Sequence, residues 1–283
     1  MNIDYLSLIN RFFDKRNRDP LEEIIETAKR QRANSPKNWT NCWNERCNNN
    51  DETRYLLVDI SLKVNSFLEV EIENVPPVHY AYPSLSRILS FFIISNGCIL
   101  GSYVLDHALT PGQIVVGTEV IVASGILGLA VLKIPEEKSL GWYCPKNKEI
   151  ILKRGELRQR LSSILAHEYT HYLQHELSST FHPIYKIFLE GHAMGVQKHI
   201  TESLAEEKKD FAYVQQTNEL QWHLEAALKL FKEHHEERKK KDPIKLVLGH
   251  SHSIGHALFQ MAERKHGKGI YIDAMKGNYS FLE

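Results

Sequence analysis

The chain has little cysteine and no excess of charge of either sign. Its 283 residues include four cysteines, and no two of them form a C-x-x-C pair. So sparse a set makes no disulfide framework and is typical of a reducing compartment, where thiols serve as small apolar side chains. Lysine plus arginine and aspartate plus glutamate both number 35. This balance predicts no nucleic-acid partner, because nucleic-acid-binding proteins concentrate positive charge on one face.

The sequence also lacks the apolar stretch that a secretory signal peptide needs. It begins MNIDYLSLINRFFDKRN, which is polar and amphipathic. A signal peptide would instead show a continuous run of apolar residues close to its start. We therefore expect a cytoplasmic protein.

Two long apolar stretches raise an alternative location. Residues 88–105 and 114–132 are each about long enough to span a bilayer, and a basic residue flanks each outer end. Asn96, Glu119 and a run of β-branched residues in the second stretch favour buried protein, partly as strand. We expect protein core here, and a membrane-inserted hairpin over 88–132 stays open as the alternative.

The predicted elements run from strands to helices, an order typical of the α+β class. Residues 141–154 have the pattern of a strand, a Pro-Lys-Asn-Lys turn and a second strand. A helical period then starts at Glu156, and a final helix is expected over 251–266. We divide the chain into an N-terminal region of unassigned type, residues 1–140, and a C-terminal region, residues 141–283.

Histidines recur at intervals of four in the stretch ILAHEYTHYLQHE, at His167, His171 and His175. Helix positions four apart differ by about 40° in azimuth, so His167 and His171 project side by side from consecutive turns. Two imidazoles placed in this way can bind one tetrahedral metal ion. Glu168 points about 100° away, beside the ion, where it can take a proton from the attacking water. This is the HExxH motif.

A third metal ligand has to come from farther along the chain. The metzincin pattern would need glycine at position 174 and histidine at position 177, but the chain has Gln174 and Leu177, which excludes it. The segment IFLEGHAMG places Glu190 with eighteen residues between it and His171. A second helix that returns antiparallel to the first could bring Glu190 to the ion and leave a fourth position open.

The spacing HExxH-x18-E, with Glu-Gly-x-Ala at the glutamate, resembles the gluzincin metallopeptidases of the aminopeptidase N and leukotriene-hydrolase branch. HSHSIGHALF is similar to that group's Tyr-x-x-Gly segment, with His252 at the position of the tyrosine that stabilises the tetrahedral intermediate. The resemblance implies a zincin-like fold: helices and a mixed sheet, then the active-site helix, then a helical C-terminal subdomain. It implies one zinc ion per chain on His167, His171 and Glu190. Glu168 is then the general base, and His252 is an oxyanion donor.

The resemblance implies a zinc-dependent peptidase that acts on peptide or protein substrates. It covers residues 141–200 and 250–270, so the gluzincin-like core is placed in 141–283. No Gly-x-Met-Glu-Asn segment precedes the motif, so nothing anchors a substrate amino terminus and an endopeptidase is favoured. Two alternatives stay open: a non-catalytic zincin-like binding module, and a membrane-anchored metalloprotease with a helical hairpin at 88–132.

Three further features have both a functional and a structural interpretation. The strand pair in 141–152 could align an extended substrate or be a plain hairpin. His175 is expected to support the site or face solvent, because a fourth protein ligand would close the metal to water. His192 either lines the cleft or packs, and the histidines of 250–256 either bind a metal or lie on the surface.

Overall fold

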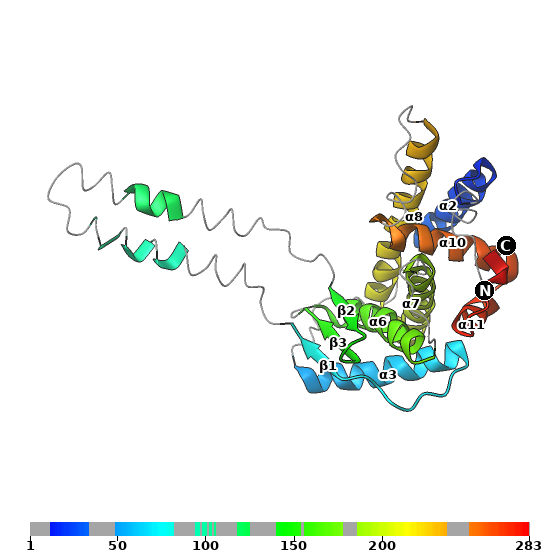
Figure 1. The fold of residues 1–283 in the computed structure, drawn as a ribbon, viewed down its shortest axis with the longest axis horizontal. Helices are drawn as coiled ribbons and strands as arrows, with labels where there is room; N and C mark the ends of the chain where they lie inside the picture. The colour runs from blue at the N-terminus through cyan, green and yellow to red at the C-terminus, as the bar shows by residue number, and fades with distance from the viewer. Residues whose placement is uncertain are drawn as a thin grey trace. The chain divides into compact units, whose positions relative to one another are not determined.

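The computed structural model divides the chain into two compact units, Met1–His79 with Gly141–Glu283, and Tyr80–Leu140. The described residues are predominantly helical and include one three-stranded sheet, which confirms the α+β class (Figure 1). The predicted boundary after residue 140 coincides with one end of the smaller unit, whereas residues 1–79 belong with 141–283. The structure describes residues 12–33, 49–81, 94–96, 98–100, 102, 103, 105, 118–124, 140–153, 156–177, 186–236 and 249–282.

Helices make up most of the larger unit, and two of their ends show familiar caps. Helix α3 begins after Asn49, whose side chain accepts a hydrogen bond from the Glu52 backbone N–H at 2.7 Å. The predicted final helix ends at Gly267, where φ is 80° and glycine has no steric penalty. The helical segments are η1 (Lys15–Asn17), α2 (Arg18–Ala33), α3 (Asn50–Leu68), α6 (Arg158–Leu177), α7 (Lys186–Lys208), α8 (Phe211–Glu236), α10 (Ser251–His266), α11 (Gly269–Met275) and η3 (Ser280–Leu282).

Helix α7 is the centre of this unit and packs against α6, α8 and α10 (Figure 1). It crosses α10 at two glycines. A Cβ atom on Gly191 would overlap the backbone of Gly255, and one on Gly255 would overlap the carbonyl of Ile187. Only glycine allows backbones to approach so closely. The crossing therefore brings together Glu190, which precedes Gly191, and His252, which lies one turn before Gly255.

The sheet has the strand order β1-β3-β2, with β1 at Val78–Tyr80, β2 at Gly141–Cys144 and β3 at Glu149–Leu152. Strands β2 and β3 pair antiparallel, with Gly141 opposite Leu152, which confirms the hairpin expected in 141–154. Strand β2 is at the edge of the sheet and packs on α6. A Cβ atom on Gly141 would lie 2.7 Å from the Ile164 side chain, so this glycine permits the close contact between hairpin and helix.

The smaller unit corrects one sequence expectation. Residues 118–124 are helical, although this part of the β-branched run was expected to form buried strand, and the Val122 side chain is 53% exposed. β-Propensity depends strongly on packing context, and these residues lack the pairing that the expectation assumed. Within the described residues, no helix is both long and apolar enough to cross a membrane. Most of 88–132 lies outside the described residues.

Candidate metal centre

Helix α6 places the two histidines of the HExxH motif side by side. The Nε2 atoms of His167 and His171 are 3.0 Å apart, and the two ring planes meet at 86°. Both side chains are largely buried, with exposed fractions of 10% and 15%. The four-residue spacing therefore aims both nitrogens at one point, as the helix geometry predicts.

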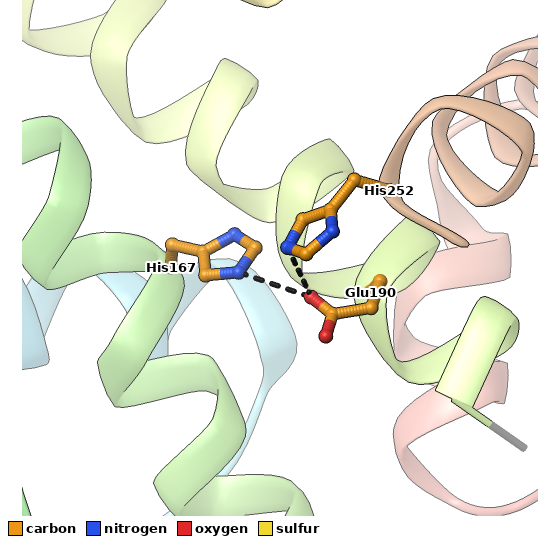
Figure 2. Close-up of side chains that lie close together, drawn as sticks. All are labelled: His167, Glu190 and His252. Carbon is orange, nitrogen blue, oxygen red and sulfur yellow. Dashed lines mark ion pairs between the residues drawn. The ribbon is translucent and has the colours of Figure 1, made fainter. Parts of the chain in front are cut away.

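Helix α7 brings Glu190 to the same point, as the spacing from His171 suggested. Its Oε2 atom lies 3.3 Å from Nε2 of His167 and 3.2 Å from Nε2 of His171. Helix α10 adds His252, whose Nε2 lies 3.0 Å from the same oxygen (Figure 2). The His252 ring also stacks on that of His167, with centroids 5.9 Å apart. Three histidines from two helices, α6 and α10, thus surround one carboxylate oxygen of Glu190 on α7.

This geometry supplies a metal-ligand set. Within the part of the chain that the structure describes, ligand atoms of His167, Glu190 and His252 lie within 4.8 Å of one another, so the group could hold a metal ion. His171 adds a nitrogen 3.0 Å from that of His167. Imidazole nitrogens with one carboxylate oxygen are donors that suit divalent transition metals.

Burial and charge act against each other at this centre. Burial alone would raise the pKa of Glu190, but hydrogen bonds from His167 and His171 outweigh it and hold that pKa far below its usual range. Burial would lower the pKa of His171, but the hydrogen bond to Glu190 and the negative charges of Glu190 and Glu168 together raise it to about 9. The carboxylate is therefore ionised and needs a neighbouring cation. A protonated His171 is one such cation, and a metal ion would be another.

Glu168 lies beside this group, on the side of strand β2. Its Oε2 atom accepts a hydrogen bond from the backbone N–H of Tyr143 at 2.7 Å, and the residue is only 7% exposed. The Tyr143 hydroxyl bonds to Nδ1 of His175 at 2.9 Å. The third histidine of the motif stretch thus contacts the hairpin, not the ligand cluster.

Some residues near the centre belong to no sequence motif. The sequence analysis left the role of His192 open and did not identify His223. His192 is buried, bonds to Gln174 and to the Tyr271 carbonyl, and has its pKa lowered to about 4 by burial, so it packs. His223 of α8 lies next to His252, with ring centroids 6.1 Å apart, and burial lowers its pKa to about 4. Only the tertiary fold brings such residues to the site. Of the histidines in 250–256, His252 belongs to the cluster around Glu190, whereas His250 and His256 do not.

No family model, curated protein or solved structure matches the chain. The resemblance to gluzincins therefore rests on sequence motifs alone, namely the HExxH-x18-E spacing, the Glu-Gly-x-Ala pattern and the segment HSHSIGHALF. What the fold adds is the convergence of that motif's side chains with His252 on one point.

Proposed function

We propose that the protein is a zinc-dependent peptidase with a gluzincin-like core and a zincin-like fold. One observation carries the proposal: both histidine nitrogens of the HExxH motif meet the carboxylate of Glu190, while Glu168 lies alongside. Peptide or protein substrates, endopeptidase specificity and a cytoplasmic location belong to the proposal, on the sequence grounds given above.

In this proposal His167, His171 and Glu190 hold the ion. Two imidazoles and one carboxylate are a ligand set typical of catalytic zinc, in which the fourth position is open to water or substrate. Bound zinc would polarise the scissile carbonyl and lower the pKa of the attacking water. The three ligands are fixed on α6 and α7, whose mutual packing is part of the core. The rigid helix pair would preserve the ligand geometry.

Glu168 would act as general base. Its Oε2 atom is engaged by the Tyr143 amide, so the proton would be received on Oε1. The same hydrogen bond fixes the carboxylate against the edge strand β2 and restricts its rotation. An edge strand can also pair with an extended peptide, and β2 borders the site at this edge. The strand would thus orient both the base and the substrate.

His252 would donate a hydrogen bond to the developing oxyanion. Its side chain is 47% exposed, whereas those of His167 and Glu190 are 10% and 12% exposed. His252 is therefore on the solvent side of the cluster, where a substrate would enter. Its 3.0 Å contact with Glu190 places it within reach of the same centre.

That contact also favours a second candidate function, a non-catalytic zincin-like module with a closed metal site. With His252 as fourth protein ligand, the ion would have the complete tetrahedral shell of a structural site. His252→Ala separates the two functions. A catalytic donor can be removed with zinc retained and turnover reduced, whereas a fourth structural ligand cannot be removed without weaker zinc binding.

The decisive experiment compares wild type with Glu168→Gln. Both proteins should hold about one zinc per chain by elemental analysis, because Glu168 is no ligand. In digests of a peptide library, the variant should lose about 10² to 10⁴ in kcat, the usual contribution of a general base. Glu176→Gln is the matched control: it changes a glutamate of the same helix, which pairs with Lys148 of the hairpin turn, and should cleave like wild type.

Two results would contradict this assignment. Equal cleavage by Glu168→Gln and wild type would place the general base elsewhere. A wild type that binds zinc firmly but cleaves no peptide in the library would favour the binding module instead.

A further inference from the structure

Gln174 lies between two histidines, one of which belongs to the metal centre. Its Oε1 atom is 2.8 Å from Nδ1 of His171, on the side of that ring away from Glu190. Its Nε2 atom donates to the Leu189 carbonyl at 3.0 Å and contacts Nδ1 of His192 at 2.9 Å. Gln174 is 4% exposed and His192 is 1% exposed. The side-chain amide is thus fully engaged in the core.

The direction of each of these hydrogen bonds follows from what the end groups can do. A backbone carbonyl only accepts, so the amide nitrogen of Gln174, and not its oxygen, has to face Leu189. The amide oxygen then faces His171, and it also only accepts. Nδ1 of His171 therefore carries the hydrogen in this contact. The remaining nitrogen of that ring, Nε2, faces Glu190.

The same reasoning fixes His192. Its Nε2 atom lies 2.9 Å from the backbone carbonyl of Tyr271, so Nε2 carries the hydrogen. Nδ1 is then the acceptor for the amide of Gln174. The chain of donors runs from His171 through Gln174 and His192 to the Tyr271 carbonyl in α11. The backbone carbonyls of Leu189 and Tyr271 can only accept hydrogen bonds, and they therefore fix which atoms of Gln174 and His192 are donors.

We propose that Gln174 and His192 are positioning residues of the metal centre, which hold His171 with its hydrogen on Nδ1 and present Nε2 as the metal-binding nitrogen. The inference rests on the proposed metal site and adds two residues to it that no motif contains. Orienting partners of this kind fix the tautomer and the ring angle of a ligand histidine. Gln174 occupies the position at which a metzincin would need glycine. The residue that excludes one subfamily thus has a function in the present site.

The test measures zinc affinity by competition with a chromophoric chelator, on the full chain. Gln174→Met keeps the length of the side chain and removes both hydrogen-bonding ends. It should weaken zinc binding about 10- to 100-fold, the usual effect of removing an orienting partner. Gln197→Met is the matched control, because Gln197 also bridges α7 and α6, through Ser163 at 2.9 Å, without touching the centre. Its zinc affinity should equal that of wild type.

His192→Phe provides a second variant that keeps an aromatic ring against Phe259 and Tyr271. It should weaken zinc binding less than Gln174→Met, because Gln174 retains its bond to Leu189. The double variant should bind zinc as tightly as Gln174→Met alone, since both residues act through the one contact to His171. Effects that simply add would identify two independent structural defects and would overturn the proposal.

The outcomes separate this inference from the function on which it rests. If His171→Ala loses zinc while both Gln174→Met and His192→Phe bind it like wild type, the metal site stands and the positioning role is overturned. If wild type does not bind zinc, the proposed function is overturned and the inference with it. Circular dichroism and a thermal melt show whether each variant is folded. If Gln174→Met does not fold, the zinc affinity of His192→Phe tests the positioning role.

Discussion

Glu190 and Glu263 both have histidine partners, and their surroundings differ in one respect. Around Glu263 of α10, each carboxylate oxygen has partners of its own. His199 lies 2.9 Å from Oε1, and the Tyr271 hydroxyl donates to Oε2 at 2.9 Å. Gln260 adds a donor to Oε2 at 3.1 Å. The partners are thus distributed over both oxygens of the carboxylate.

Around Glu190 the partners converge. Three histidine nitrogens lie between 3.0 and 3.3 Å from the single atom Oε2. Two of those nitrogens, on His167 and His171, are also only 3.0 Å from each other. Imidazole nitrogens can approach so closely only with a proton or a cation between them. Convergence on a point, and not the mere number of histidines and carboxylates, is what makes the Glu190 cluster a candidate metal site.

The largest expected effect follows directly from this difference. Glu190→Gln should weaken zinc binding by more than the about 100-fold that supporting residues contribute, because it removes a charged ligand. Glu263→Gln, the same change in the other cluster, should leave zinc affinity unchanged. Chelator competition on the two purified variants measures both. The comparison fails if the two variants bind zinc equally well.

A smaller effect concerns stability and its dependence on pH. Burial alone would raise the pKa of Glu263, but the interactions with His199, Lys198 and Tyr271 together outweigh it and lower the pKa to about 2. A carboxyl with a lower pKa in the folded than in the unfolded chain stabilises the fold above the unfolded value, 4.5, and this stabilisation disappears as the pH falls toward 2. The shift corresponds to at most about 3 kcal/mol at neutral pH.

Glu263→Gln should therefore be less stable than wild type at pH 7, by up to that amount, and the difference should shrink between pH 4.5 and pH 2. Urea denaturation at several pH values, with a chelator present in every sample, measures the free energy of unfolding of both proteins. A difference that stays constant over the whole range would show that the Glu263 charge contributes nothing to stability.

The part of the site that the sequence predicted is the part set by local geometry. A four-residue interval on a helix fixes the relation of His167 to His171, and a strand pattern with a turn fixes the hairpin of β2 and β3. Glu190 was found from its spacing in the motif. Its approach to His252 depends on the contact of Gly191 in α7 with Gly255 in α10, and the pattern Glu-Gly-x-Ala includes only the first of these glycines.

The rest depends on partners distant in the chain. The Tyr143 amide reaches Glu168 across 25 residues, and His192 reaches the Tyr271 carbonyl across 79 residues. Backbone groups and lone histidines leave no periodic signal, so the sequence offered no sign of these contacts. Residues 118–124 show the opposite error, since a strong local β preference did not decide their structure.

The smallest effect is expected at His175, which continues the four-residue interval of the proposed ligands His167 and His171 but has a different partner. His175→Ala should keep full zinc content, because its Nδ1 bonds to the Tyr143 hydroxyl at 2.9 Å and not to the metal cluster. Removing a partly buried hydrogen bond of this kind should lower the free energy of unfolding by about 1 kcal/mol.

Tyr143→Phe tests the same hydrogen bond from its other end. The substitution keeps the backbone N–H that holds Glu168, so it should alter stability without abolishing turnover. Because each variant removes the same bond, the double variant should be less destabilised than the sum of the two singles. Urea denaturation of the four proteins gives this coupling, and elemental analysis gives their zinc content. If His175→Ala lost zinc and Glu190→Gln retained it, the third ligand would be His175, on the next turn of α6, and not Glu190 on α7. The contrast between convergent and distributed carboxylates would then no longer identify the metal centre.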